Sequence, residues 1–317
     1  YLTGTHTWPS WLSDYPLHIS ERFSINSSGV LVIEAGVRLE LTNPISYPPI
    51  RIYGTLNTLG TTNNPVVFTR QTGIANWGYM SFEGMSGGRL DYTIIEYGSG
   101  IGIESSDVQI ANSIIRYSKY SGISINNASP EISDSVVTDN DQVGIRINRG
   151  SSIISGCIIV NNDSYGIDID YASPTVSGCT IAYNGDNGID VFDSGSGSGE
   201  NSSPIISGCS IANNNGIGID LSGIQLVDSL PVVSGNTISS NADYAVRVKV
   251  DKLSTAFANA NTFSENGEDA VYVLANGQYL TGTHTWPSWL SDYPLHISER
   301  FSINSSGVLV IEAGVRL

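Results

Sequence analysis

Four aspartates recur at spacings that a repeating fold would bring together as one acidic cluster. Asp168, Asp190 and Asp220 occupy equivalent positions in three successive repeats, and Asp170 lies just beyond Asp168. Stacked strands lie ~4.8 Å apart, a distance at which two carboxylates repel by roughly 1 kcal/mol in water. The repulsion must be opposed by Arg146, by a Ca²⁺ ion held through carboxylate oxygens, or by solvation alone. A solvated acidic face is the interpretation we favour, so no cofactor is required; a Ca²⁺ ion at these four aspartates and a catalytic carboxylate group are the alternatives.

A catalytic role would make stricter demands on these side chains. Hydrolysis of a glycosidic bond uses two carboxyl groups in different environments, one of which stays protonated. The spacing does not single out such a pair. The histidines His6 and His18, and their copies His284 and His296, stand apart from the acidic cluster in the sequence. We therefore expect that the protein is not an enzyme.

The elements that position the aspartates are short repeated segments in which apolar and polar residues alternate. Each begins with Gly-Ile, and they follow one another at a constant step, at 122–125, 144–147, 166–169 and 188–191. The frame continues at Gly102, Gly218, Ala245 and Ala270, with a Gly/Ser-rich loop inserted at 193–201. Alternation predicts strands with one buried face, and a fixed short period predicts a solenoid. The sequence therefore predicts an all-β parallel β-helix solenoid with about 22 residues per coil.

Three N-terminal segments, at 29–39, 52–56 and 64–69, share a pattern with known repeats, as do the repeated Gly-Ile segments. Residues 17–275 resemble the right-handed parallel β-helix repeats of cell-surface proteins, as found in NosD-like proteins and in polysaccharide-acting β-helix enzymes. The resemblance implies a right-handed solenoid. It says little about activity, since one fold hosts many functions.

Two columns of inward side chains follow from the stacking. The first holds three thiols, Cys157, Cys179 and Cys209, which are each a full repeat apart and so fit neither a zinc site nor a redox motif. We predict buried, reduced cysteines that act as small hydrophobic residues. The second column is a ladder of asparagines that stack amide on amide. Its members are Asn140, Asn162, Asn184, Asn214, Asn241 and Asn266.

The chain contains a long exact repeat. Residues 279–317 are identical to residues 1–39. We predict tandem units: unit 1–278 holds a junction or cap (1–16), N-terminal coils (17–95) and regular coils (96–278), and 279–317 begins the next identical unit. Copies of the protein stacked end to end are the expected partner, because a following unit covers the open edge of a solenoid.

The junction is aromatic, although the end cap of a monomeric solenoid is usually polar. We expect its large side chains to seal one unit against the next, with those of the second copy largely buried. The proposed assembly junction consists of Trp8, Trp11, Tyr15, Trp286, Trp289 and Tyr293.

Composition narrows the partners and the location. The formal net charge of −16 argues against nucleic acid, which requires basic patches. No apolar run approaches the roughly 18 residues of a membrane span, and the absence of an initiator Met predicts a mature or internal fragment. Asn-x-Ser sequons make Asn26, Asn127 and Asn201 candidates for glycosylation.

These features favour an extracellular, cell-surface structural protein whose units stack into a stalk, sheath or filament. The exact repeat is the main reason for this prediction. Two alternatives stay open: a carbohydrate-binding or polysaccharide-degrading β-helix protein, for which glycans are the partner, and a calcium-dependent adhesin.

Overall fold

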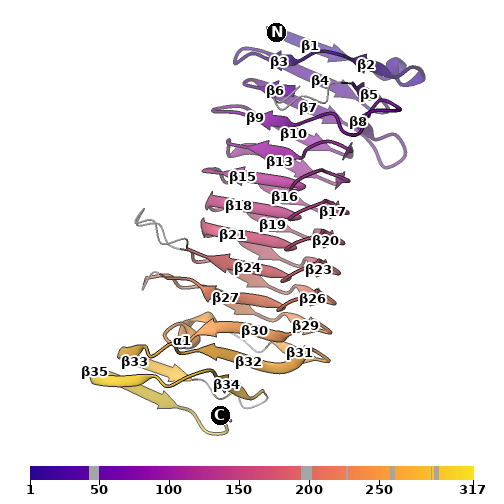
Figure 1. Cartoon of the computed structure of the whole chain (residues 1–317). Coiled ribbons are helices and arrows are strands. Elements are labelled where there is room, and N and C mark those ends of the chain that lie inside the picture. The colour runs from indigo at the N-terminus through magenta and orange to yellow at the C-terminus, as the bar shows by residue number, and fades with distance from the viewer. Residues whose placement is uncertain (43–49, 194–201, 226–227, 258–260, 287, 289–292) are drawn as a thin grey trace. The chain divides into compact units, whose positions relative to one another are not determined.

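The computed structural model describes residues 1–42, 50–193, 202–225, 228–257, 261–286, 288 and 293–317. The chain divides into two compact parts, Tyr1–Ser164 and Tyr165–Leu317. Each part is built from short parallel strands stacked coil upon coil (Figure 1). The predicted all-β parallel solenoid is therefore confirmed.

In the first part, each coil contributes one strand to each of three parallel sheets, which we name A, B and C. Sheet B contains β1 (Thr5–Trp8), β4 (Val30–Glu34), β7 (Thr55–Leu59), β10 (Gly87–Asp91), β13 (Asp107–Ala111), β16 (Glu131–Ser133) and β19 (Ile153–Ser155). Sheet C contains β2 (Leu17–Ile19), β5 (Arg38–Leu41), β8 (Val66–Arg70), β11 (Thr93–Glu96), β14 (Ile114–Arg116), β17 (Val136–Thr138) and β20 (Ile158–Val160). Sheet A contains β3 (Phe23–Ile25), β6 (Ile50–Ile52), β9 (Met80–Phe82), β12 (Ile101–Ile103), β15 (Ile123–Asn126) and β18 (Ile145–Gly150).

The second part repeats the arrangement. Sheet A contains β21 (Ile167–Ala172), β24 (Ile189–Phe192), β27 (Ile219–Gly223), β30 (Tyr244–Lys249), β32 (Glu268–Leu274) and β34 (Leu295–Ile297). Sheet B contains β22 (Thr175–Ser177), β25 (Ile205–Ser207) and β28 (Val232–Ser234), and sheet C contains β23 (Thr180–Ala182), β26 (Ser210–Ala212), β29 (Thr237–Ser239) and β31 (Thr262–Ser264). β33 (Tyr279–Trp286) and β35 (Ser302–Ile311) form a separate two-stranded sheet.

Helical structure is short. A 3₁₀ helix, η1, covers Ser10–Asp14, and a single α-helical turn, α1, covers Leu253–Ala256. The sequence predicted that residues 1–16 form a cap outside the repeat, but β1 within that segment pairs with β4 as an ordinary strand of the solenoid. Within the described chain, no helix is long and apolar enough to cross a membrane.

Register follows the buried aliphatic residues. The step between paired residues is short in the regular coils, where Glu131 pairs with Ile153, and longer near the N-terminus, where Thr55 pairs with Gly87. One of the predicted equivalent positions is wrong. Gly102 was expected to align with Gly122, but it pairs with Ser124. The inward side chains of Ile101 and Ile103 are both fully buried and fix this register, so the frame position belongs to Gly100.

The turn between sheet B and sheet C requires a left-handed residue in every regular coil. Glycine meets this need at Gly178 and Gly208, with φ of 61° and 62°, while Asn112 and Asp134 occupy the same place with φ of 50° and 47°. These residue types tolerate positive φ better than other side chains do. Gly, Asn and Asp therefore recur at this position of the repeat because the backbone needs a positive φ there.

Both predicted inward columns are present. The three cysteines are free thiols and are buried. Asn214 is 1% exposed and lies in the middle of the asparagine ladder. Its Nδ2 donates to Asn241 Oδ1 at 2.9 Å, and its Oδ1 accepts from Asn184 Nδ2, also at 2.9 Å. The ladder thus joins the buried amides of Asn184, Asn214 and Asn241 across three successive coils.

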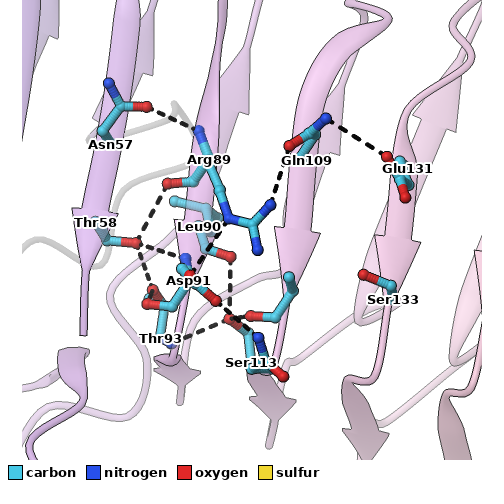
Figure 2. Close-up of polar contacts among 12 residues, drawn as sticks. Asn57, Thr58, Arg89, Leu90, Asp91, Thr93, Gln109, Ser113, Glu131 and Ser133 are labelled. Carbon is cyan, nitrogen blue, oxygen red and sulfur yellow. Dashed lines mark hydrogen bonds and ion pairs between the residues drawn. The ribbon is translucent and has the colours of Figure 1, made fainter. Parts of the chain in front are cut away.

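In the first part of the chain, buried hydroxyl groups bond to one another near the turn between sheets B and C (Figure 2). The hydroxyl groups of Thr58 and Thr93 lie 2.6 Å apart, and the Thr93 N–H donates to Ser113 Oγ at 3.0 Å. On the outer face of sheet B, the Arg89 guanidinium donates to Gln109, which in turn donates to Glu131. Polar contacts therefore link successive coils both inside and outside sheet B.

The two copies of the repeated segment keep one strand pairing and change another. Trp8 pairs with Ile33 in the first copy, and Trp286 pairs with Ile311 in the second. The strand Leu17–Ile19 pairs with β5 in sheet C, whereas its copy Leu295–Ile297 pairs with β32 in sheet A. So short an apolar strand carries little register information of its own, and the neighbouring strand edge therefore decides where it pairs.

Candidate functional site

The outer face of sheet A in the second part of the chain gathers three of the four predicted aspartates. Asp168 on β21 pairs in register with Asp190 on β24, which pairs with Asp220 on β27. Neighbouring strands lie ~4.8 Å apart, so the three carboxylates form one short column. Asp170 lies further along β21, opposite Phe192. We call Asp168, Asp190 and Asp220 the acidic column.

Asp220 is held in an ion pair at the end of this column. Arg247 on β30 is its register partner, and its Nε donates to Asp220 Oδ1 at 3.0 Å. The Arg247 NH2 group also donates to Asp220 Oδ2, and the backbone N–H of Ser222 donates to Oδ1 at 2.9 Å. Asp220 is only 4% exposed. Its carboxylate is thus a fixed negative charge with oriented donors on both oxygens.

Asp190 lies in a different environment. It is half-buried and accepts one hydrogen bond, from Asn187 Nδ2 to Oδ1 at 2.8 Å. Burial and the negative charges of Asp220 and Asp168 raise the pKa of Asp190 to about 7, against smaller lowering effects from Asn187 and Arg247. Near neutral pH this carboxyl group therefore exchanges a proton readily, beside a carboxylate held in an ion pair.

These two environments supply the distinction that the sequence did not reveal. The expectation of a protein without catalytic activity rested on finding no distinguishable pair of carboxyl groups. Asp190 and Asp220 are such a pair, because one is partly desolvated among like charges and the other is bound to a guanidinium. The spacing of the aspartates placed them correctly, but burial and the contact with Asn187 are properties of the folded chain.

Aromatic side chains flank the acidic column. Burial raises the pKa of Tyr165, and the negative charges of Asp190, Asp186, Asp168 and Asp220 raise it further. Beyond Arg247, the same outer column continues with Tyr272. The Tyr272 ring lies 4.8 Å from that of Tyr244. Aromatic faces of this kind offer apolar area with a polar edge.

A histidine completes this end of the face. His296 on β34 is the register partner of Tyr272. Its ring meets the Tyr244 ring edge-on with centroids 5.6 Å apart, and its Nδ1 lies 3.3 Å from the Tyr244 hydroxyl. The sequence predicted that His296 lies in the first strand of the next unit, apart from the acidic residues, whereas β34 pairs with β32 in sheet A.

The calcium prediction has a different outcome. Among the residues that the structure describes, no group of three or more acidic, histidine or cysteine side chains is arranged to hold a metal ion. Arg247 occupies the place beside Asp220 that a cation would need. A Ca²⁺ ion at Asp168, Asp170, Asp190 and Asp220 stays a prediction, for which the effect of chelators on the melting temperature is the test.

The predicted junction residues differ in exposure. Trp286 is fully buried and its ring lies 5.7 Å from that of Phe301. Trp11 and Tyr15 are 70% and 75% exposed, and Trp8 is half-buried. The Tyr293 ring lies 4.3 Å from the Phe263 ring, tilted by 40°, and the Tyr293 hydroxyl accepts a hydrogen bond from the Phe263 backbone N–H. Trp289 lies outside the described residues, and contact between successive units stays a prediction.

The three candidate glycosylation sites are equally varied. Asn127 is exposed on a turn, with a left-handed backbone at φ of 51°. Asn26 is half-buried, and its Oδ1 accepts bonds from the Ser27 hydroxyl and the Ser28 N–H. Asn201 lies outside the described part of the chain. Of the two that can be described, Asn127 offers the more accessible amide.

A comparison with protein families fits this architecture. The family described as "Right handed beta helix region" matches residues 80–199 and 197–284, which together exceed half of the chain. The chain belongs to the right-handed β-helix family. The family match therefore supports the right-handed coil that the resemblance implied. It does not show that this chain is a cell-surface protein.

Solved structures of similar shape are distant in sequence. The A-module of the mannuronan C-5 epimerase AlgE6 from Azotobacter vinelandii matches with a TM-score of 0.55 and 15% identity, over 98% of this chain and 91% of that chain. The periplasmic alginate epimerase AlgG gives a TM-score of 0.46 at 13% identity, over 98% and 84%. Pectate lyase Pel9A gives 0.43 at 14% identity, over 91% and 71%. No curated protein matches the chain significantly. These likenesses concern the fold alone.

Proposed function

We propose that this β-helix binds a polysaccharide along the outer face of sheet A in residues 165–317 and hydrolyses it with Asp190 as the general acid. The observation that carries the proposal is the pair of neighbouring carboxyl groups in opposite environments. Asp190 has a pKa of about 7, and Asp220 is bound to Arg247. Glycoside hydrolysis needs this combination of a proton donor and a negative charge at close range.

The chemistry assigns one role to each side chain. Protonated Asp190 gives its proton to the glycosidic oxygen as the bond between that oxygen and the sugar carbon breaks. Positive charge develops on the sugar ring, and the fixed carboxylate of Asp220 stabilises it because its donors are already oriented. A water molecule then bonds to the sugar carbon and releases its proton, which restores protonated Asp190. Every bond broken is thereby matched by a bond formed.

Charge and aromatic area indicate the substrate class. The chain carries a formal net charge of −16, and the face itself holds the acidic column. Both disfavour a polyanion, so a neutral polysaccharide is the better fit. The rings of Tyr244 and Tyr272 next to the column offer apolar surface for packing against sugar rings. The AlgE6 module shares this fold and is named for mannuronan, which makes polyuronates the alternative substrates to test.

The test is release of reducing ends from a panel of polysaccharides by the purified chain. Neutral glucans, xylans and mannans form one arm, and mannuronan, alginate and pectate form the other. We expect hydrolysis of a neutral member, with a rate that falls as the pH rises above about 7 and Asp190 loses its proton.

Substitution decides whether the acidic column is responsible. Asp190→Asn should reduce the rate by about 10²–10⁴-fold, the usual contribution of a general acid. Asp141→Asn changes an exposed aspartate in the other part of the chain and serves as the matched control. Full activity in Asp190→Asn, or neither cleavage nor binding of any member of the panel, would refute the proposal.

The exact repeat favours a second function that is compatible with the first. We also propose that the protein is extracellular and that units equivalent to 1–278 stack end to end into a stalk, sheath or filament. The identical copy at 279–317 supports this, since a tandem unit would begin with the same segment. Electron microscopy of the native material tests it: particles that never extend beyond single units would contradict it.

A further inference from the structure

A polar cavity lies away from the acidic column, beside the start of the repeated segment. Its volume is about 450 Å³, and its walls come from Gln225, Ser229 and Leu230, from the start of α1 and from β33. The residues that matter here are Ser229, Asp251, Lys252, Ser254, Gln278 and His284. α1 packs against β28, β30 and β33, and Figure 1 shows α1 next to β30 and β33.

Four polar side-chain atoms at the cavity are buried and have no hydrogen-bond partner within the described residues. They are Ser229 Oγ, Asp251 Oδ1, Ser254 Oγ and Gln278 Oε1. Ser229 as a whole is completely buried. A buried polar atom without a partner is unfavourable, and native proteins rarely keep several of them in one place. Their convergence on one cavity indicates a site that a polar ligand completes.

A lysine is buried in the same wall. Lys252 is 2% exposed, and its Nζ donates to the backbone carbonyl of Ser229 at 3.1 Å and lies 3.9 Å from Asp251 Oδ2. Burial lowers the pKa of Lys252. The amine of Lys252, the hydroxyl groups of the two serines and the acceptor oxygens of Asp251 and Gln278 therefore belong to the lining of one cavity.

The mixture of groups decides the ligand class. The oxygens of Asp251 and Gln278 only accept hydrogen bonds, and the two serine hydroxyls both donate and accept. An inorganic anion offers no donors for the acceptor oxygens. A metal cation meets the amine of Lys252 close to Asp251. A ring bearing several hydroxyl groups supplies donors and acceptors together, and a cavity of this volume is within the usual range for small ligands.

We propose that this cavity is a sugar-binding site for one or two pyranose rings, separate from the acidic column. It does not depend on the hydrolytic activity proposed above. The site joins side chains of the coils before residue 258 to side chains of β33, which belongs to the repeated segment. Sugar binding would therefore connect the repeated segment to the coils that precede it.

The experiment is saturation-transfer NMR and thermal melting on the full chain with methyl glycosides of glucose, galactose and mannose. Sodium sulfate and calcium chloride are the probes for the competing chemistries. We expect at least one glycoside to bind and to raise the melting temperature, and we expect no comparable effect from either salt. An effect of sulfate or calcium without any glycoside binding overturns the proposal, as does a complete absence of binding at millimolar sugar.

Gln278→Leu removes the acceptor oxygen at nearly constant volume and leaves the backbone bonds of Gln278 to Ala275 and Ser302 intact. It should weaken binding at least tenfold, whereas Gln142→Leu, at an exposed position, should not. Ser254→Ala is a second test if Gln278→Leu folds poorly by circular dichroism. Unchanged affinity in both variants overturns the proposal. Asp190→Asn should leave this binding intact, which separates the failure of one site from the failure of the other.

Discussion

At the residue scale, the behaviour of this β-helix depends on the environment of one carboxyl group. Asp190 lies between the carboxylates of Asp168 and Asp220 and is only partly in contact with solvent. The pKa that results, about 7, lies well above the ordinary value of 3.8. Perturbed groups of this kind gather at functional sites, although ion-pair networks also create them. The neighbouring ion pair of Asp220 with Arg247 supplies the contrast on which the proposed role as general acid depends.

The raised pKa has a cost in stability with a definite pH dependence. Between about pH 4 and pH 7 the folded chain holds a proton on Asp190 that the unfolded chain has lost, so the free energy of unfolding falls as the pH rises through this range. Asp190→Asn removes this dependence. We expect the variant to be more stable than the parent at pH 8, by about 1–3 kcal/mol, and similar to it at pH 4.

Urea denaturation at pH 4, 6 and 8 measures this effect, with Asp141→Asn as the control. If the difference between Asp190→Asn and the parent were the same at pH 4 and pH 8, the proton on Asp190 would not be the cause.

At the element scale, each coil is joined to the next through both its core and its turns. The asparagine ladder is the clearest case, because Asn184 donates to Asn214 and Asn214 donates to Asn241, each at 2.9 Å. Asn214→Ala removes both of these contacts, so the amide of Asn184 loses its bond to the next coil. We expect a loss of about 2–4 kcal/mol in the free energy of unfolding.

The control is the adjacent position. Asn215 is exposed, and its side chain makes one long contact, 3.4 Å from the Gly185 carbonyl. Asn215→Ala should change the free energy of unfolding by less than about 0.5 kcal/mol. Equal effects of the two substitutions in chemical denaturation would show that the ladder contributes little.

These elements also show which features can be predicted from the sequence alone. Alternation and period were sufficient to predict the coils, the cysteine column and the asparagine ladder, because each depends on one residue type at a fixed step. They were insufficient at Gly102, where a two-position shift keeps the same alternation and only the burial of Ile101 and Ile103 selects the register. The pKa of Asp190 and the cavity beside Ser229 were beyond reach, since both arise where side chains from separate coils meet.

At the scale of the whole molecule, the repeated segment is the dominant feature. Its two copies share the pairing of β1 with β4 and of β33 with β35, including the tryptophan that opposes an isoleucine. They differ in the strand Leu295–Ile297, which joins sheet A in the second copy. Identical sequences thus pair with different strands, so the sequence of one copy does not determine the pairing of the other.

The proposed end-to-end assembly depends on the aromatic residues of this segment. Trp286→Ala removes a fully buried side chain and should weaken the contact between consecutive units by about 2–4 kcal/mol. Sedimentation and electron microscopy of the variant measure assembly. Trp11→Ala, which changes an exposed tryptophan of the first copy, is assayed beside it for comparison. Fibres of unchanged stability from Trp286→Ala would reduce the junction to a simple linker.

The most direct test of the proposed catalytic site is a titration of the Asp190 carboxyl carbon by ¹³C NMR, with Asp190→Asn used for assignment. A titration midpoint near pH 7 is the expected result, because burial and the charges of Asp220 and Asp168 favour the protonated form. A midpoint near 4, the ordinary value for an aspartate, would contradict the proposed general acid.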